Sequence, residues 1–588
     1  MSYRAPVRDI SFSLFHEAGF DRLFAGNSET IDADLAQSIL EEAGRFTSEV
    51  IAPISWTGDQ EKAELTDEGV IVPPAFVDAY RQLVEGGWPT LAAPVEFGGQ
   101  GLPLSLSNAV YDMLNSNIAF TLCPMLTNGA VEALTAHASD EMKAKYLPKI
   151  ISGEWSGTMN LTEPQAGSDV GALKTKAEPV SDGSYRIKGT KIYITYGDHN
   201  MAENVIHLVL ARLPGAPEGT KGISLFLVPK YFVNDDGSLG AQNDVKCIGL
   251  EEKLGIHASP TCVMSYGEDD GAIGWLIGAE NKGMAAMFTM MNNARLHVGL
   301  QGVGVAERAT QLATNFAIER KQSKAFDSKP EDGPIAIIGH PDVKRMLMTM
   351  RSLTDAARAI CYENGVLHDL AHQNNDAQAK ALNDLLTPIS KSFSTDIANE
   401  VAALGVQVHG GMGFVEETGA AQHVRDARIL TIYEGTNGIQ AIDLIGRKLP
   451  LDNGGVVATF INQIRDTSEE CKNHGNPAVR EIGMALDSAI QDLNDSTDWM
   501  LDAQQPQADK LAAATAYQRL FSLAAGGHYL ARGAIRACID MEGDFTRKKI
   551  SVARFFALNL LPETSALKSS VMQGSDCLSD VDEACLTA

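Results

Sequence analysis

The sequence lacks the features that most readily assign a chain to a secreted, metal-binding or membrane class. Its eight cysteines stand singly among 588 residues, with no Cys-x-x-Cys pair and none of the close spacing that a disulfide framework or zinc site requires. The N-terminal "MSYRAPVRDISFSLFHEAGF" has no basic segment followed by an apolar one, and no segment reads as long enough for a membrane span. We therefore expect free thiols, no bound metal and a cytoplasmic location.

Basic residues are also scarce. The chain has 48 Lys and Arg against 75 Asp and Glu, a formal net charge of -27. Phosphate backbones and anionic membrane surfaces are bound mainly by clustered Lys and Arg, so neither nucleic acid nor a membrane is an expected partner. The acidic balance is typical of a solvated protein surface and names no substrate.

Common catalytic and nucleotide-binding motifs are missing as well. The sequence has no His-Glu-x-x-His, no Gly-x-x-x-x-Gly-Lys-Ser/Thr loop and no Gly-x-Ser-x-Gly elbow. The stretch closest to a dinucleotide fingerprint, "GVGVAE" from Gly302, lacks the third glycine and lies within a helical pattern. These glycines are expected to pack helices together, and a Rossmann unit is not predicted.

What the sequence does contain is a change of periodicity along its length. Apolar residues recur every three or four positions in "DADLAQSILEEAGRFTSEVIAPI", which predicts helices, whereas "YRIKGTKIYIT", "NVIHLVLARL" and "GISLFLV" predict strands. Long helical patterns return from about Met284, enough for a four-helix bundle, and a further helical segment reaches about Leu561 before a poorly patterned tail. The predicted fold is multi-domain and mainly α with a central β domain, divided at 1–156, 157–280, 281–449 and 450–588.

Three stretches could carry chemistry. The loop "TMNLTEPQAGSDVGALKT" (158–175) combines hydroxyls with free backbone amides that could bind a polar planar or anionic ligand, although a plain surface turn has the same composition. The strand "KIYITYGDH" follows it. In "TIYEGTNGIQ" one acid, Glu434, stands between apolar residues and a turn, where it could equally be a helix cap.

Taken together, these stretches resemble the acyl-CoA dehydrogenase family over about residues 31–449. The resemblance implies a helical lobe, a β-barrel-like domain and a four-helix bundle, with the remaining C-terminal residues as an additional helical extension. The long N-terminal lead-in and this extension resemble a subgroup with long chains.

The resemblance implies that FAD is the cofactor, bound across the interface of a homodimer. Tyr193 stands where the family usually has Trp beside the flavin, and Thr195 stands where a hydroxyl bonds near N5. The "ERKQ" and "QVHGGMGF" stretches match elements that bind the dinucleotide. The implied cofactor-binding residues are Met159, Leu161, Thr162, Tyr193, Thr195, Arg320, Gln407, Gly410, Gly411 and Thr436.

The family's reaction removes the α-hydrogen of an acyl thioester as a proton while the β-hydrogen leaves as hydride to the flavin. The resemblance places the base at Glu434, where apolar neighbours would raise the pKa and strengthen the carboxylate as a base. Arg295 matches a position near the active site, but it could equally be an ion-pair residue of a helix. The implied substrate-binding residues are Ser168, Arg295, Tyr433 and Gly435.

Resemblance to the long subgroup implies 3-methylmercaptopropionyl-CoA as the substrate and 3-methylthioacryloyl-CoA as the product. A thioether sulfur is nearly isosteric with a methylene, so a short- to medium-chain fatty acyl-CoA is the alternative substrate. The family also implies an electron-transfer flavoprotein as acceptor. The sequence is compatible, too, with an oxidase that passes electrons to O₂ and with a non-catalytic acyl-CoA-binding relative.

Overall fold

The N-terminal lobe of the computed structural model is mainly helical, and side chains cap the N-termini of α2, α6 and α7. The structure describes residues 3–24, 31–329, 331–373 and 375–587. Asp32 caps α2 by accepting a hydrogen bond from Leu35 N at 2.8 Å, and Ser139 caps α7 in the same way. The elements of this lobe are α1 (Val7–Phe12), η1 (Ser13–Glu17), α2 (Ala33–Phe46), α3 (Ile54–Gln60), β1 (Glu64–Thr66), β2 (Gly69–Ile71), α4 (Pro74–Glu85), α5 (Leu104–Leu114), α6 (Ile118–His137) and α7 (Asp140–Ser152).

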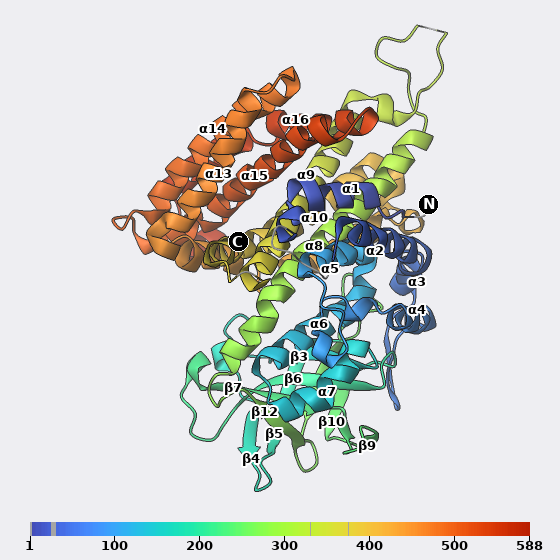
Figure 1. The fold of residues 1–588 in the computed structure, drawn as a ribbon, viewed down its shortest axis with the longest axis vertical. Coiled ribbons are helices and arrows are strands. Elements are labelled where there is room, and N and C mark those ends of the chain that lie inside the picture. Colours follow the sequence, from blue (N-terminus) through green and yellow to red (C-terminus); the bar gives the residue numbers. More distant parts are fainter. Residues whose placement is uncertain (1–2, 25–30, 330, 374, 588) are drawn as a thin grey trace.

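A central β domain follows, at the lower end of the molecule in Figure 1. Its main sheet has the order β10-β11-β5-β12-β7-β6-β3, with β4 beside β5 and β6; the pairs that β6 makes with β3 and β4 are parallel, and the others are antiparallel. The three predicted strands are confirmed as β5, β6 and β7. The strands are β3 (Trp155–Asn160), β4 (Lys176–Pro179), β5 (Tyr185–Thr195), β6 (Asn204–Arg212), β7 (Ile223–Pro229), β8 (Tyr231–Val233), β9 (Leu239–Gln242), β10 (Val245–Leu250), β11 (Thr261–Tyr266) and β12 (Ala272–Ile277).

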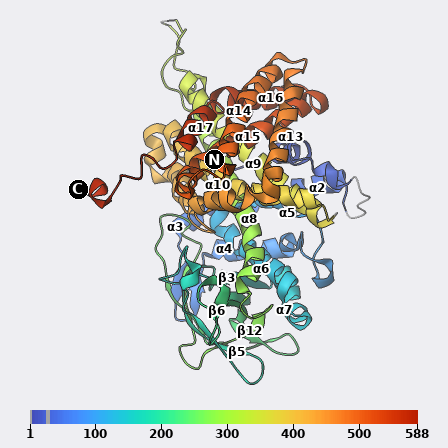
Figure 2. The same ribbon diagram turned by 90° about the vertical axis from the view of Figure 1, so that its left-hand side faces the viewer.

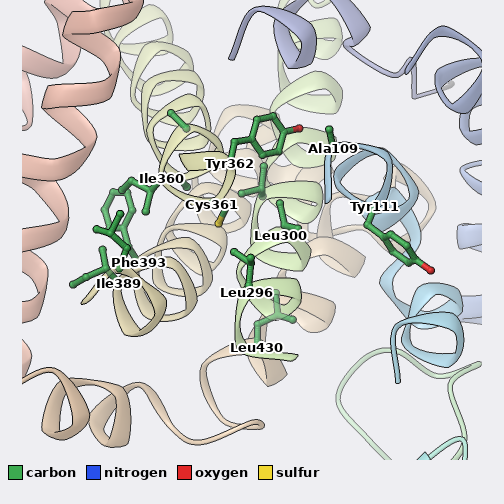
Figure 3. Packing of buried hydrophobic residues seen from close by; sticks show 14 of the residues in the cluster. Ala109, Tyr111, Leu296, Leu300, Ile360, Cys361, Tyr362, Ile389, Phe393 and Leu430 are labelled. Atoms are coloured by element: carbon green, nitrogen blue, oxygen red, sulfur yellow. The ribbon is translucent and has the colours of Figure 1, made fainter. Parts of the chain in front are cut away.

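The long helices predicted after the β domain are α8 (Gly283–Glu319), α9 (Pro341–Gln373) and α10 (Ala377–His409). The fourth place in this bundle is divided between two short helices, α11 (Ala420–Ala427) and α12 (Asn437–Asp443), both of which pack on α10. Figure 3 shows side chains of the shared core, including Leu296 of α8, Ile360 of α9 and Phe393 of α10.

Two glycines of "GVGVAE" bring neighbouring helices close together. A Cβ atom at Gly302 would overlap the backbone of Ser394 on α10, and one at Gly304 would lie 2.6 Å from the side chain of Asn115. Only glycine lets these backbones approach so closely. The prediction that this stretch packs helices, and does not form a Rossmann turn, is confirmed.

The C-terminal helices lie on the α9 and α10 side of the bundle, at the opposite end of the molecule from the β domain (Figures 1 and 2). The expectation of a poorly patterned tail after Leu561 is wrong. A further helix, α17, packs on α14 and α15, and it buries Val571 and the hydroxyl of Thr564, which donates to Asp492 at 2.9 Å. The helices are α13 (Gly455–Lys472), α14 (Pro477–Leu501), α15 (Gln507–Asp540), α16 (Asp544–Asn559), α17 (Glu563–Gln573) and α18 (Glu583–Leu586).

One stretch is longer and more apolar than the sequence prediction allowed. Residues 104–137, comprising α5, α6 and the turn between them, have the length and composition of a membrane-crossing helix. However, 83% of the most apolar window is buried inside the protein. The stretch serves as the core of the N-terminal lobe, where it packs on α8 and β3.

A buried ionic cluster joins the two ends of the chain to the bundle. Lys549 of α16, whose side chain is 4% exposed, lies 3.3 Å from Asp9 Oδ1, 3.7 Å from Glu17 Oε1 and 3.9 Å from Asp355 Oδ2 on α9. Deeper in the bundle, Arg358 of α9 bonds Asp112 of α5 at 2.7 Å and Glu307 of α8 at 3.1 Å. These charges fix the N-terminal lead-in, the C-terminal helices and the bundle in one arrangement.

Lys549→Met should destabilise the protein strongly, because the change leaves the carboxylates of Asp9, Glu17 and Asp355 without their shared cation. Breaking a buried pair in this way costs about 3–5 kcal/mol. Lys548→Met is the matched control, since Lys548 also bonds Asp9, at 2.7 Å, but is 40% exposed, and its loss should cost under about 1 kcal/mol. Thermal unfolding followed by circular dichroism measures both, and equal midpoints for the two variants would contradict the account.

Candidate active site

Glu434 lies in a tight turn between the short helix η12 (Arg428–Thr431) and α12. Its φ is +53°, in the left-handed region that residues other than glycine seldom adopt, and Gly435 follows at +83°. The turn is held from its far side: Thr436 Oγ1 accepts from Ile439 N at 3.3 Å, and Gln440 Nε2 donates to Glu434 O at 3.3 Å. Strained backbone of this kind persists where its surroundings fix it, commonly at functional sites.

The structure of the turn requires both Gly435 and Thr436. A Cβ at Gly435 would lie 2.9 Å from Gln440 Nε2, so a side chain there would displace the bond that closes the turn. Thr436 is the N-cap of α12, with its O–H still able to donate. Within the described chain, the backbone N–H of Glu434 has no acceptor, which leaves it free for a ligand oxygen.

The electrostatic setting of Glu434 combines loss of water with nearby positive charge. The side chain is half-buried, and removal from water raises its pKa to about 7, an effect that the cations of Arg295 and Lys391 oppose. Arg295 of α8 is 4% exposed and bonds Asp443 of α12 at 3.2 Å. Arg295 is therefore an ion-pair residue with a partner on another helix, and its charge also lowers the pKa of Glu434; a role in substrate binding stays a prediction.

Tyr433 connects the turn to α8. Its hydroxyl donates a hydrogen bond to Oε1 of Gln301, which is fully buried, while Nε2 of Gln301 has no partner in the described chain. The preceding segment is anchored by Leu430, which is buried in the same hydrophobic core as Leu296 of α8 (Figure 3). Tyr433 is thus held in place beside Glu434.

Two residues of the site were not found in the sequence. Lys391 of α10 is fully buried, and its Nζ donates to Asn437 Oδ1 at 2.8 Å. Burial lowers the pKa of this lysine to about 7. Nothing in "PISKSFSTDI" separates it from an ordinary exposed helix lysine, because its burial depends on α12 covering that part of α10. Asn437 lies in the recognised turn, but its role requires α10.

The β domain supplies a second group of predicted residues. Ile192 N donates to Thr162 O at 2.9 Å, which sets the loop after β3 alongside the end of β5. Met159, at the end of β3, is partly buried, and Thr195 O accepts from Thr158 Oγ1 at 2.7 Å. Among the described residues, the N–H groups of Leu161 and Thr162 have no acceptor.

Tyr193 is turned outward by a bulge in β5. Two residues of β5 oppose one of β11 at this point, φ of Tyr193 is +59°, and its side chain is 60% exposed. An exposed aromatic ring beside free backbone donors and a hydroxyl suits a flat polar ring system such as that of a flavin.

The loop that contains Thr162 is held by a buried ion pair that the sequence did not reveal. Glu163, which is 3% exposed, accepts from Lys191 Nζ at 3.0 Å and from Thr175 Oγ1 at 2.6 Å. The charge of Lys191 and the bonds from 174–175 lower the pKa of Glu163 to about 2, although burial acts in the other direction. Ser168, farther along the loop, is exposed, and its hydroxyl makes no hydrogen bond among the described residues.

The remaining predicted cofactor residues form a third group, away from the others. Arg320 follows α8, while Gln407, Gly410 and Gly411 lie at the end of α10; stacking of Phe316 on His409, with ring centroids 4.4 Å apart, brings these two ends together. About 25 helical residues separate Arg320 from Arg295, or about 37 Å at 1.5 Å per residue.

The chemistry of this third group suits a pyrophosphate. Within the described chain, no carboxylate forms an ion pair with Arg320, and the only hydrogen bond of its guanidinium is a long one of 3.4 Å to Gln322. Gly410 (φ +62°, ψ −139°) exposes backbone in a conformation that is almost exclusive to glycine. A guanidinium without an acidic partner, beside exposed glycine backbone, suits the phosphates of a dinucleotide such as FAD. One chain therefore carries groups that suit a flavin ring and groups that suit a pyrophosphate, at separate places.

Family models match the chain in order along its length. They are described as "Acyl-CoA dehydrogenase, N-terminal domain" (residues 34–154), "Acyl-CoA dehydrogenase, middle domain" (158–267), "Acyl-CoA dehydrogenase, C-terminal domain" (281–449) and "Acetyl-CoA dehydrogenase C-terminal like" (460–582). The 3-methylmercaptopropionyl-CoA dehydrogenase of Ruegeria pomeroyi is 45% identical, with 98% of this chain and 99% of that protein covered. A butyryl-CoA dehydrogenase of Syntrophomonas wolfei is 34% identical, with 95% of each covered.

Solved structures share the fold over almost the whole length. Caenorhabditis elegans ACDH-11 in complex with C11-CoA has a TM-score of 0.79 at 19% identity, covering 98% of this chain and 96% of that one. An acyl-CoA dehydrogenase complexed with FAD from Bacillus anthracis has a TM-score of 0.75 at 20% identity, covering 100% and 94%. The C-terminal helices are thus part of a fold that these proteins share.

Glu163→Gln should weaken retention of the flavin, because it leaves the fully buried ammonium of Lys191 unpaired and releases the loop that contains Thr162. Losing one partner of a buried pair costs about 3–5 kcal/mol, enough to reduce the flavin-to-protein ratio below about half. The ratio is read from absorbance after gel filtration, with the exposed Glu178→Gln on β4 as the control. Full flavin content in Glu163→Gln would show that the pair does not support the site.

Proposed function

This chain belongs to the acyl-CoA dehydrogenase family and is an FAD-dependent oxidoreductase, and we propose that Glu434 is the base that removes the α-proton of its acyl-CoA substrate. The observation that carries the proposal is the setting of this carboxylate, which is half-buried, held in a left-handed turn and flanked by two buried cations. A carboxylate with a pKa of about 7 accepts a proton far more readily than one in water.

The same turn can stabilise the charge that forms as the α-proton leaves. Negative charge then develops on the thioester oxygen, and a preorganised backbone N–H is an effective partner for it. The N–H of Glu434 is such a donor, since nothing in the described chain uses it. Gly435 keeps side-chain atoms away from this side of the turn, and Tyr433, bonded to Gln301, holds its other end.

FAD, when bound, supplies the acceptor for the hydrogen that leaves the β-carbon. Leu161 and Thr162 would bind its ring through their free N–H groups, and Tyr193 and Thr195 would lie beside it. Arg320, Gln407, Gly410 and Gly411 would bind the pyrophosphate of a second FAD, held mainly by another copy of the chain. Because the two groups of residues lie apart in one chain, this arrangement supports a homodimer in which both subunits contribute to each FAD site.

We propose 3-methylmercaptopropionyl-CoA as the substrate and 3-methylthioacryloyl-CoA as the product. The name and near-complete coverage of the Ruegeria pomeroyi relative support this choice. The Syntrophomonas wolfei relative, a butyryl-CoA dehydrogenase, supports a short fatty acyl-CoA as the alternative. A pocket separates a thioether from a methylene by only ~1 to 3 kcal/mol, so activity with butanoyl-CoA is expected too.

We propose an electron-transfer flavoprotein as the acceptor that reoxidises the enzyme. Membership of the acyl-CoA dehydrogenase family, for which this acceptor is implied, supports the choice. Ser168, exposed on the loop beyond Thr162, is proposed to contact the CoA part of the substrate.

Replacing Glu434 with Gln should abolish the fast reductive half-reaction, because an amide cannot accept the α-proton. Under anaerobic conditions, bleaching of the flavin band by 3-methylmercaptopropionyl-CoA should slow about 10²–10⁴-fold. Glu68→Gln, an exposed acid on the β1–β2 hairpin, is the matched control and should bleach at the parent rate. The base assignment fails if Glu434→Gln, with full flavin content, bleaches as fast as the parent.

The pH dependence of kcat/KM should report the same carboxylate. Because Glu434 must be unprotonated to accept a proton, activity should be full above its pKa and should fall by about tenfold per pH unit as the pH drops through about 7. Steady-state assays with an artificial electron acceptor measure this profile. A flat profile between about pH 5 and 8 would mean that no group with this pKa takes part.

A further inference from the structure

Lys391 is a buried cation without an ion-pair partner. Its side chain has no exposed surface, and within the described residues no carboxylate lies at ion-pair distance from its Nζ. Among these residues, the one hydrogen bond that its ammonium makes is to a neutral acceptor, Asn437 Oδ1, at 2.8 Å. A buried ammonium with so little compensation is costly, so it is kept where its charge has a use.

Asn437 joins Lys391 to the turn that contains Glu434. Its Nδ2 donates to Asp396 Oδ1 at 2.7 Å, to Thr395 Oγ1 at 3.0 Å and to Ser392 O at 3.2 Å, all on α10. These bonds fix the amide with its oxygen toward Lys391. Asn437 is the first residue of α12, and Glu434 lies just before α12 in the turn. The hydrogen bonds of Asn437 therefore attach this turn directly to α10.

The charged groups around this place come from several elements. Asp396 lies on α10, as Lys391 does. Its negative charge is already partly compensated by the hydrogen bond from Asn437 and by the positive charge of Arg519 on α15. Arg295 of α8 pairs with Asp443 of α12, which Arg447 also bonds. The acid with the largest electrostatic influence on Lys391 is Glu434, followed by Asp396.

We propose that Lys391 is a positioning residue for Glu434: through Asn437 it fixes the turn, and its charge keeps the Glu434 carboxylate ionised when the acyl chain displaces the remaining water. The proposal rests on the proposed function, in which Glu434 is the base. Without a cation, a desolvated carboxylate would take up a proton from solvent before the substrate arrives. Arg295, whose charge is shared with Asp443, also holds down the pKa of Glu434, so the two cations act on the carboxylate together.

The electrostatics agree with this geometry. Burial lowers the pKa of Lys391 to about 7, and Glu434 opposes that fall; conversely, Lys391 opposes the rise in the pKa of Glu434. Each group therefore favours the charged form of the other. Removing the ammonium should raise the pKa of Glu434 further, by about 1 to 3 units, as the loss of a nearby opposite charge usually does.

The test compares Lys391→Met with Lys391→Arg. In Lys391→Met the acid limb of the kcat/KM profile should move up by about 1 to 3 pH units, and bleaching at pH 7 should slow at least about tenfold. Lys391→Arg keeps the charge and should restore most of both. Lys448→Met is the matched control. It removes a cation that bonds Asp384 of α10 at 2.9 Å, and its rate and pH profile should match those of the parent.

A second readout does not depend on turnover. The carboxyl stretching band of Glu434, obtained as the infrared difference between each protein and its Glu434→Gln counterpart, titrates with the side chain itself. Its midpoint should rise in Lys391→Met and return in Lys391→Arg. If Glu434→Gln remains active while this midpoint moves as expected, the proposed base is wrong but the pairing with Lys391 stands.

Asn437→Ala tests the positioning half of the proposal and avoids a buried charge change. It should slow bleaching on the high-pH plateau by about tenfold or more while moving the acid limb less than Lys391→Met does. The proposal is overturned if Lys391→Met leaves both the infrared midpoint and the pH profile where the parent has them. It is also overturned if Asn437→Ala bleaches at the parent rate on the plateau.

Discussion

The balance between lost water and added positive charge at Glu434 is the constraint around which the site is arranged. Burial raises the pKa of the carboxylate to about 7, and the cations of α8 and α10 limit that rise. Either effect alone would give a poor base: an exposed carboxylate is weak, and a desolvated carboxylate without cations is protonated. The left-handed turn keeps the carboxylate where both effects act on it.

The rest of the fold keeps this balance in place. The long helices α8 and α10 carry Arg295 and Lys391, and α12 carries Asp443 and Asn437, so the turn is bonded on both sides. The C-terminal helices pack on α10 through α13 and α15. The cluster around Lys549 joins these helices to the start of the chain and to α9, far from the turn in sequence. The stability of the distant cluster thus supports the geometry of the site.

The sequence predicted the order of helical and β segments, because periodicity records which face of each element is buried. It also placed Glu434 in an apolar turn and interpreted Gly302 as a packing residue, since both depend on local context. It did not reveal Lys391 or the Glu163–Lys191 pair, because nothing local distinguishes a lysine that a distant helix will cover. The helix at 563–573 was missed for a related reason: it packs on α14 and α15, a contact that no short pattern records.

Exchange of the α-hydrogen of the bound substrate with solvent tests the central claim most directly, because it isolates proton removal at Glu434 from the redox step. The protein is incubated anaerobically with excess 3-methylmercaptopropionyl-CoA deuterated at the α-carbon, and loss of the label is followed by mass spectrometry. The account predicts rapid loss with the parent protein and almost none with Glu434→Gln, under conditions where both bind the substrate. Equal loss with the two proteins would contradict it, because another group would then be removing the proton.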